Sequence, residues 1–295
     1  MTVHIPVLAA EAIRYLQPER GGVFVDCTVG LGGHTSALLA AGASRIIGLD
    51  RDLDALDRAR ETLAPWIERV DLVHADFRSL DAVLDRLGVP VVDGALADLG
   101  VSSLQFEGAG RGFSFQRDEP LDMRMDRSGG ETAADLVAAS GERELADAIF
   151  QYGEERYSRR IARAIVETRR RSPIETTGQL AAIVRRAVPR RGFMRIDPAT
   201  RTFQAIRIWV NRELDGLDQF LEATARRLRL GARLVVITFH SLEDRIVKHT
   251  FRALERSEDA PLRILTKKPV VATDQELQHN PRARSAKLRA AERAA

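Results

Sequence analysis

Short apolar segments alternate with amphipathic segments through the first hundred residues of the chain. Four apolar segments have the length and composition of buried strands, and they lie at residues 23–27, 45–49, 69–73 and 93–98. Three segments with helical spacing lie between them, near residues 34–41, 52–63 and 79–86. This alternation predicts a parallel sheet whose strands are connected by right-handed crossover helices.

The alternation stops after the fourth predicted strand, and residues 105–202 contain no convincing buried strand. Helical signals take its place. They are Thr132 with Asp135, the segment at residues 158–169, and a capping box at Thr176 with Gln179. This change of pattern indicates a helical insertion.

A strong apolar strand at residues 234–239 then resumes the earlier pattern. We therefore predict an α/β fold in which a doubly wound sheet is interrupted by an all-helical domain. The first part of the sheet domain is expected at residues 1–104, the inserted domain at 105–202 and the second part of the sheet domain at 203–295.

Two segments in the last third of the chain give further predictions. Asp197-Pro198 has the character of a helix cap, and the apolar face that follows is expected to dock on the sheet. The residues of that face, at three-to-four spacing, are Ile206, Trp209, Val210, Leu214, Leu217, Phe220 and Leu221. Residues 280–285 are expected to form a basic loop before a short or frayed helix.

The connection between the first predicted strand and the first predicted helix contains Gly30, Gly32 and Gly33. Glycine lets the backbone turn tightly and approach a ligand, and the free N–H groups of the following helix point at that ligand. Asp50 ends the next strand, 20 residues after Gly30, where a carboxylate can accept hydrogen bonds from ribose hydroxyls. Together these features predict a pocket for an adenosine-bearing cofactor.

The spacing of the glycines bears on which cofactor is bound. The dinucleotide fingerprint requires glycine at its first, third and sixth positions, and the sixth position here is Thr35. Asp26 ends the first strand. This pattern suits a ligand without a pyrophosphate, such as S-adenosylmethionine, whose amino-acid end carries an ammonium and a carboxylate. S-adenosylmethionine is favoured, and NAD stays open as the alternative.

Several candidate residues lie at the ends of predicted strands, where ligands bind in doubly wound sheets. They are Gly30, Asp50, Phe77 and Asp98. A carboxylate at Asp98 could accept a hydrogen bond from an exocyclic amine or hold the amino group of the cofactor; the simpler alternative is an acid that caps the next turn.

The later strand ends at His240, and Ser241 with Asp244 is expected to begin a helix. His240 is a candidate for contacting the substrate. No Ser–His–Asp order or histidine-rich cluster stands out, so a hydrolase is poorly supported and no metal is expected.

Composition limits the remaining classes. The 295 residues are 44% hydrophobic, enough for a sizeable core, and no apolar run approaches the roughly 20 residues that span a bilayer. The single cysteine, Cys27, excludes an intramolecular disulfide and is expected to pack as a small apolar side chain. With no signal-peptide pattern at the N-terminus, we expect a cytoplasmic protein.

Charge is distributed unevenly along the chain. Between Arg156 and Arg212 there are 15 arginines and three acids, a net charge of +12, whereas the rest of the chain carries −9. Concentrated guanidinium groups favour a polyanionic partner such as nucleic acid. The alternative is a solvated helix face.

Eight motifs together resemble one family, the bacterial 16S ribosomal RNA cytosine-N4 methyltransferases (RsmH, or MraW), and the resemblance runs from His4 to the last residues. The motifs are Gly32-Gly33-His34, Asp98-Leu99-Gly100-Val101-Ser102-Ser103, Arg111-Gly112-Phe113-Ser114-Phe115, Leu121-Asp122-Met123-Arg124-Met125, Tyr152-Gly153-Glu154-Glu155-Arg156, Pro198-Ala199-Thr200-Arg201-Thr202-Phe203-Gln204-Ala205, Phe239-His240-Ser241-Leu242-Glu243-Asp244-Arg245 and Asn280-Pro281-Arg282-Ala283-Arg284.

The resemblance implies a Rossmann-like class I methyltransferase sheet with an inserted helical domain. It also implies S-adenosylmethionine-dependent methylation of the N4 amine of a decoding-centre cytidine, with 16S rRNA in the small ribosomal subunit as partner. The cofactor residues that it implies are Gly32, Gly33, His34, Asp50, Phe77, Asp98 and Gln105, with Asp98 also as the catalytic residue.

Some alternatives stay open beside this resemblance. Phe77 is expected to pack on the adenine, or else to be an ordinary core phenylalanine. Other amino-methyltransferases use an Asn/Asp-Pro-Pro-Tyr loop where this chain has Asp98-Leu99-Gly100-Val101, so the way in which the amine is held is open. A non-catalytic RNA-binding or assembly factor is the second functional hypothesis. The sequence does not determine the oligomeric state.

Overall fold

The computed structural model describes residues 5–189 and 196–295. The chain divides into two compact units. The sheet unit comprises Met1–Ser102 and Gly216–Ala295, and the helical unit comprises Ser103–Asp215. The second unit is therefore an insertion into the first, as the change of pattern in the sequence predicted.

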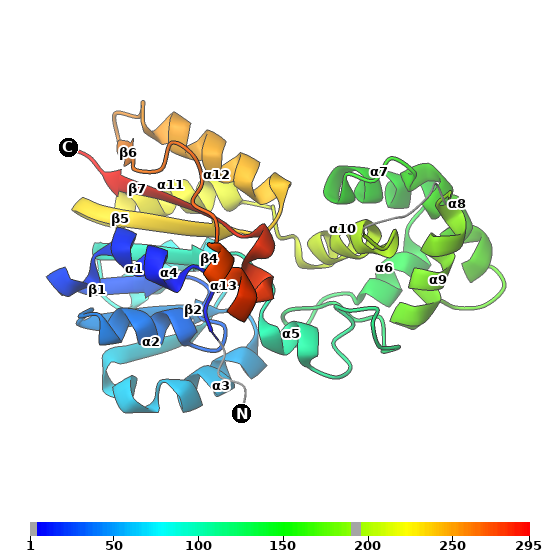
Figure 1. Cartoon of the computed structure of the whole chain (residues 1–295), viewed down its shortest axis with the longest axis horizontal. Coiled ribbons are helices and arrows are strands. Elements are labelled where there is room, and N and C mark those ends of the chain that lie inside the picture. The colour runs from blue at the N-terminus through cyan, green and yellow to red at the C-terminus, as the bar shows by residue number, and fades with distance from the viewer. Residues whose placement is uncertain (1–4, 190–195) are drawn as a thin grey trace. The chain divides into compact units, whose positions relative to one another are not determined.

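The sheet unit contains a seven-stranded sheet in the order β3-β2-β1-β4-β5-β7-β6 (Figure 1). The first five strands in this order are parallel, and β7 is antiparallel to both of its neighbours. The strands are β1 (Val23–Asp26), β2 (Arg45–Asp50), β3 (Val70–His74), β4 (Val92–Asp98), β5 (Leu228–Thr238), β6 (Leu262–Ile264) and β7 (Lys287–Arg293). The first four and β5 lie where the sequence predicted strands, which confirms the α/β fold class.

Side chains alternate between the two faces of the sheet along each strand. Both faces are apolar here, so helices cover both of them. On one face, strand residues such as Phe24, Ile46 and Leu96 pack with α1 (Ala9–Leu16), α2 (Gly33–Ala40) and α3 (Leu53–Thr62). On the other face, their neighbours Val25, Ile47 and Ala95 pack with α4 (Leu80–Arg86), α11 (Leu217–Arg227) and α12 (Ser241–Leu254). Cys27 is buried in the second of these cores, as expected of a small apolar side chain.

The remaining helices of the sheet unit are short. They are α13 (Asp274–His279) and the 3-10 turns η1 (Pro18–Arg20), η2 (Ala64–Arg69), η3 (Phe77–Ser79) and η4 (Pro281–Ser285).

The helical unit has its own hydrophobic core. Its helices are α5 (Ser103–Glu107), α6 (Ala133–Ala139), α7 (Glu142–Gly153), α8 (Ser158–Arg169), α9 (Thr177–Ala187) and α10 (Ala199–Asn211). α7 packs against α8 and α10. Gly153 of α7 permits a close approach to α10, because a Cβ there would lie 2.6 Å from the carbonyl oxygen of Arg201.

The local helix signals in this unit are confirmed. Both capping boxes form, Thr132 with Asp135 and Thr176 with Gln179. The side chain of Asp197 accepts a hydrogen bond from the amide of Ala199 at 2.8 Å, at the start of α10.

The expectation that one long apolar helix face docks on the sheet is wrong. α10 ends at Asn211, and Arg212 and Gly216 both have left-handed φ angles, 50° and 68°, before α11 begins. Phe203 and Ile206 belong to the core of the helical unit. The later apolar residues, Leu217, Phe220 and Leu221, belong to the core of the sheet unit. The helical unit therefore extends beyond the expected end at residue 202 and includes α10.

The expectation of a short or frayed C-terminal helix is also wrong, because residues 287–293 form β7 between β5 and β6. Lys, Leu, Arg, Ala and Glu favour helix, but here the segment completes the hydrogen bonds of two strands, and that tertiary gain outweighs local propensity. Arg289 is buried and donates to the carboxylate of Asp244 at 2.6 and 3.2 Å. Although burial alone would raise it, Arg289 and Lys287 hold the pKa of Asp244 below its ordinary value.

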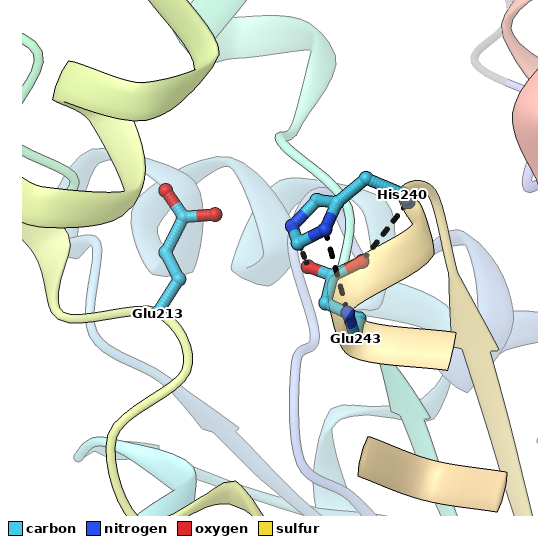
Figure 2. Close-up of side chains that lie close together, drawn as sticks. All are labelled: Glu213, His240 and Glu243. Carbon is cyan, nitrogen blue, oxygen red and sulfur yellow. Dashed lines mark hydrogen bonds and ion pairs between the residues drawn. The ribbon is translucent and has the colours of Figure 1, made fainter. Parts of the chain in front are cut away.

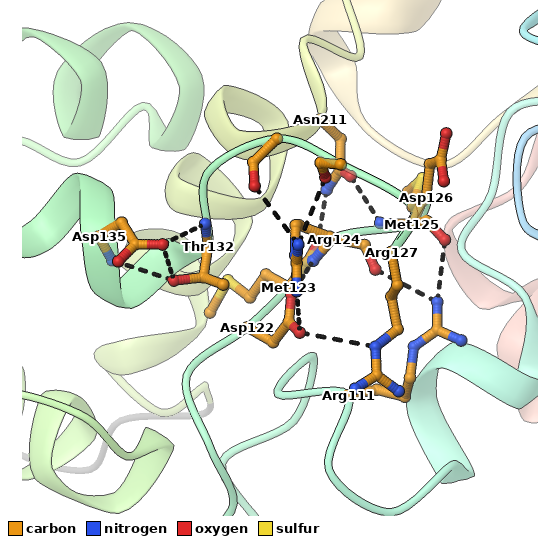
Figure 3. Close-up of polar contacts among 12 residues, drawn as sticks. Arg111, Asp122, Met123, Arg124, Met125, Asp126, Arg127, Thr132, Asp135 and Asn211 are labelled. Carbon is orange, nitrogen blue, oxygen red and sulfur yellow. Dashed lines mark hydrogen bonds and ion pairs between the residues drawn. The ribbon is translucent and has the colours of Figure 1, made fainter.

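Asn211 ties the Leu121–Met125 loop to the end of α10 (Figure 3). Its side-chain amide donates to the carbonyl oxygen of Met123 at 2.7 Å, and its side-chain oxygen accepts from the amide of Met125 at 2.8 Å. Met123 is fully buried with a left-handed φ of 61°, a conformation that costs about 1–3 kcal/mol for a residue other than glycine. Arg111 adds a hydrogen bond to the carbonyl oxygen of Met125 at 3.0 Å.

We expect Asn211→Ala to lower the free energy of unfolding of the helical unit by about 1–3 kcal/mol, because it leaves two buried backbone groups of the loop without partners. Denaturant unfolding measures the loss, and hydrogen exchange of the Met125 amide should accelerate. Gln204→Ala is the matched control, since it removes a single bond to the carbonyl oxygen of Tyr152. Equal effects of the two variants would contradict the role assigned to Asn211.

Candidate functional site

The glycine turn after β1 has the conformation that the sequence predicted. Gly30 and Gly32 have left-handed φ angles of 54° and 83°, which side-chain-bearing residues rarely adopt. Gly33 lies close to Pro6, because a Cβ there would be 3.3 Å from the Pro6 side chain, a tight contact. The amide of Ser36 makes the first hydrogen bond to Gly32, so the three preceding amides of α2 lack an intrahelical partner.

Asp26 anchors this turn from inside the protein. The carboxylate is fully buried; it accepts the Thr35 hydroxyl at 2.7 Å and the Thr28 amide at 3.2 Å. Burial raises the pKa of Asp26, and His34, Thr35 and Thr28 offset this only in part. Asp26 therefore holds the turn together and is not exposed to a ligand.

Asp50 lies at the carboxyl end of β2, beside the glycine turn. Its two carboxylate oxygens accept the amide of Gly30 at 2.7 Å and the amide of Asp52 at 2.9 Å. Burial raises the pKa of Asp50 to about 6, although these two hydrogen bonds favour the charged form. A partly buried carboxylate at this position can still accept hydrogen bonds from a hydroxyl-bearing ligand.

Asp98 ends β4, on the other side of β1. Its amide donates to the Thr28 hydroxyl at 2.7 Å, and its Oδ1 accepts the amide of Gly100 at 3.3 Å. Its Oδ2 lies 3.4 Å from Nε2 of His34, and the two side chains are 21% and 7% exposed. The Asp98 carboxylate therefore caps the turn that follows β4, which was the simpler of the two alternatives for this residue. It is also partly exposed to solvent.

Phe77 follows β3, but its ring points into the protein. It is 9% exposed and packs with Leu80 and Leu217 in one of the sheet cores. Its ring centroid lies 4.7 Å from that of Phe220. Of the two alternatives for this residue, the packing supports the core phenylalanine rather than a ring that stacks on adenine.

Gln105 lies in α5 of the helical unit, where it is buried. The sheet unit by itself therefore brings together five of the seven cofactor candidates around the carboxyl ends of β1, β2 and β4, which are Gly32, Gly33, His34, Asp50 and Asp98.

His240 forms the N-terminal cap of α12 together with Glu243 (Figure 2). Glu243 accepts the amides of Phe239 at 2.9 Å and His240 at 3.3 Å, and the Glu243 amide donates to Nδ1 of His240 at 3.4 Å. The helix begins at Ser241, as expected, but its N-terminal cap is formed by His240 and Glu243 and not by Ser241 and Asp244. His240 is engaged in this cap, which gives it a structural role at the end of β5.

Sequence reasoning missed two threonines of the turn, Thr28 and Thr35. Thr35 was noted only as a departure from the dinucleotide fingerprint, yet its hydroxyl satisfies the buried Asp26. A buried acid followed by threonines two and nine residues later is a signal that could have been read as an internally bonded turn.

These residues fit a nucleoside cofactor with an amino-acid end. The turn has three glycines, unpaired amides begin α2, and carboxylates end the two strands that flank β1. In addition, Nε2 of His34 is buried without a hydrogen bond of normal geometry. The fold and this site define a Rossmann-like protein whose pocket suits a nucleoside cofactor such as S-adenosylmethionine.

Comparison with known proteins places the chain within this class. The model of the MraW methylase family matches residues 1–294, and the chain belongs to this family. It is 51% identical to a protein of Geotalea uraniireducens named ribosomal RNA small subunit methyltransferase H, over 98% of each chain. It is 52% identical to a protein of the same name from Sorangium cellulosum, over 98% of this chain and 90% of that protein. An NAD-dependent oxidoreductase is therefore no longer an alternative.

None of the helices that the structure describes combines the length and apolar character needed to cross a membrane.

We expect Thr35→Val to lower the free energy of unfolding by about 1–3 kcal/mol, because the buried Asp26 carboxylate loses a donor while the side chain keeps its shape. Denaturant unfolding measures the change. Thr62→Val is the control: its hydroxyl is exposed and donates to a carbonyl within α3, so we expect a change of at most about 0.5 kcal/mol. A loss at Thr35 as small as that at Thr62 would contradict the anchoring role of Asp26.

Proposed function

We propose that this protein transfers a methyl group from S-adenosylmethionine to the N4 amine of a cytidine in the decoding centre of 16S rRNA, within the small ribosomal subunit. Membership of a methylase family and about 50% identity to proteins named ribosomal RNA small subunit methyltransferase H support an rRNA substrate. The single observation that carries a reaction on an amine is the partly exposed Asp98 carboxylate at the end of β4.

In this proposal the cofactor lies on the glycine turn, at Gly32, Gly33 and the backbone amide of His34. Asp50 accepts hydrogen bonds from the ribose hydroxyls, since it ends β2 next to the turn and its carboxylate is partly exposed. Asp98 lies on the opposite side of β1, toward the amino-acid end of the cofactor. Phe77 is left out of this proposed set, because its ring packs in the sheet core against Phe220.

S-adenosylmethionine, when bound, supplies an electrophilic methyl group. The cytosine amine is a weak nucleophile, because its lone pair is delocalised into the ring. The protein therefore has to supply most of the rate by placing the amine at attack distance. Asp98 does this by accepting a hydrogen bond from one N–H of the amine, which favours a pyramidal nitrogen with a localised lone pair. When the new N–C bond forms and the sulfur–methyl bond breaks, the surplus N4 proton passes to the Asp98 carboxylate and from there to solvent. The unstacked base that this requires is typical of enzymes that act on nucleobases.

The helical unit provides the surface that we propose for RNA. In α8, Ile161 and Ile165 are fully buried, whereas Arg159, Arg160 and Arg163 are exposed at helical spacing. Their charges belong to the segment with 15 arginines and three acids. Because guanidinium groups bind phosphate oxygens bidentately, this face suits an RNA backbone.

The function is tested by incubating the protein with methyl-labelled S-adenosylmethionine and small ribosomal subunits that lack the modification, followed by digestion to nucleosides. We expect the label in N4-methylcytidine. Asp98→Asn should reduce transfer by about a hundredfold or more while changing cofactor affinity less. Cofactor binding without label in any nucleoside would instead support the non-catalytic assembly factor.

Cofactor affinity should depend on the protonation of Asp50, whose pKa is about 6 in the free protein. The ionised carboxylate is the better acceptor for ribose hydroxyls, so affinity should be full above pH 7 and fall toward tenfold per pH unit below about pH 6. Calorimetric titration between pH 5 and 8 measures this. Asp50→Asn should bind weakly with no such acid limb, and the exposed Asp57→Asn should keep the wild-type profile; an unchanged profile in Asp50→Asn would refute the ribose contact.

Charge reversal at Arg159, Arg160 and Arg163 should weaken RNA binding and flatten its salt dependence. Each lost phosphate contact lowers the slope of log affinity against log salt by about 0.7–0.9. Binding to small subunits measured over a series of salt concentrations gives the slope.

The matched control reverses three exposed arginines of the sheet unit, Arg58, Arg60 and Arg86. If the α8 triple variant kept the wild-type slope, or if the control lost as much, the exposed face of α8 would be a solvated surface and not an RNA contact.

A further inference from the structure

The buried imidazole of His34 lies among carboxylates that come from three different elements. Asp98 of β4 is nearest, with its Oδ2 at 3.4 Å from Nε2. Asp26 of β1 and Glu276 of α13 also act on it electrostatically. Glu276 is itself held in place, because it accepts the amide of Leu8 at 2.7 Å. Asp98, Asp26 and Glu276 are the charged groups with the largest effects on His34.

Burial lowers the pKa of His34, but the nearby Asp98 carboxylate, together with Asp26 and Glu276, outweighs burial, so that the pKa of His34 is raised above its ordinary value. The charged imidazolium is therefore favoured more strongly in the folded protein than in a solvent-exposed histidine. A neutral donor could form a hydrogen bond with Asp98, but it could not balance the fully buried carboxylate of Asp26 at the same time.

Asp98 is restrained on every side except its exposed edge. Thr28 holds its amide, Gly100 donates to Oδ1, and His34 faces Oδ2. The His34 side chain is buried and Nε2 is inaccessible to solvent, so it does not itself reach a bound molecule. Any effect that His34 has on the reaction must pass through the carboxylate that it faces.

We propose that His34 is a positioning residue whose imidazolium orients the Asp98 carboxylate from the interior of the sheet unit, so that the exposed edge of Asp98 is presented to the cofactor amino group or to the substrate amine. This inference rests on the proposed function and adds to it a charge-dependent support behind the reacting site. It predicts that the site fails as the pH rises through the pKa of His34, where the imidazolium loses its proton.

The ion pair is tested first in the free protein, by NMR titration of the His34 imidazole. We expect a pKa above the ordinary histidine value in the wild type, and a fall of about one unit or more in Asp98→Asn, because an opposite charge within a few ångströms shifts a pKa by that amount. A pKa at or below the ordinary value, or one that Asp98→Asn leaves unchanged, would overturn the proposal. This test needs no cofactor.

The effect on function is tested with S-adenosylhomocysteine binding and with turnover, each measured between pH 6 and 9. In the wild type, affinity or rate should fall toward tenfold per pH unit above the pKa measured for His34. His34→Gln should be impaired by about tenfold or more at pH 7 and should lack this limb. His249→Gln, which changes an exposed histidine of α12, should retain the wild-type profile.

A double-mutant cycle distinguishes action through Asp98 from a general structural loss. If His34 acts through Asp98, His34→Gln should have little further effect in the Asp98→Asn background. Additive losses, or a wild-type profile in His34→Gln, would refute the positioning role. A wild type that binds no S-adenosylhomocysteine would instead refute the proposed function, while the titration would still decide the ion pair.

Discussion

The buried carboxylate of Asp26 is the interaction on which the candidate site depends. It accepts the Thr35 hydroxyl from the first turn of α2 and the Thr28 amide from the glycine turn. Thr28 in turn accepts the amide of Asp98 at the end of β4. Because a buried carboxylate without partners is costly, the turn cannot rearrange without a large loss of stability. Three segments that meet at the carboxyl edge of the sheet are thus held in one arrangement.

The helical unit meets a different requirement, since it is inserted between β4 and β5 and folds around a core of its own. Asn211 and Arg111 hold a loop whose fully buried Met123 adopts a left-handed backbone conformation. The core side chains of α8 face inward, whereas its residues Arg159, Arg160 and Arg163 are exposed to solvent. This arrangement agrees with the proposal that the helical unit provides a charged surface and the sheet unit provides the cofactor site.

The positions of the candidate residues could be predicted more fully than their roles. Gly30, Asp50 and Asp98 follow predicted parallel strands, and any such sheet places the carboxyl ends of its strands on one edge. The direction in which each side chain points could not be predicted in the same way. Phe77 turns into the core against Phe220, and the sequence could not favour this over an adenine contact because both put an aromatic ring beside the same strand. The pairing of His34 with Asp98 joins residues far apart in the chain, and spacing along one strand or helix does not encode it.

The sequence by itself determined the elements that are stabilised by contacts between residues close together in the chain, or that have a regular hydrophobic period. The capping boxes at Thr132 and Thr176 form as predicted because both partners lie within one helical turn. The tertiary structure decided the rest. Residues 287–293 have the composition of a helix, yet they form a strand because β5 and β6 offer unpaired backbone groups that only another strand can satisfy. Likewise α10 joins the helical core and α11 the sheet core, since an apolar face has the same periodicity whichever core buries it.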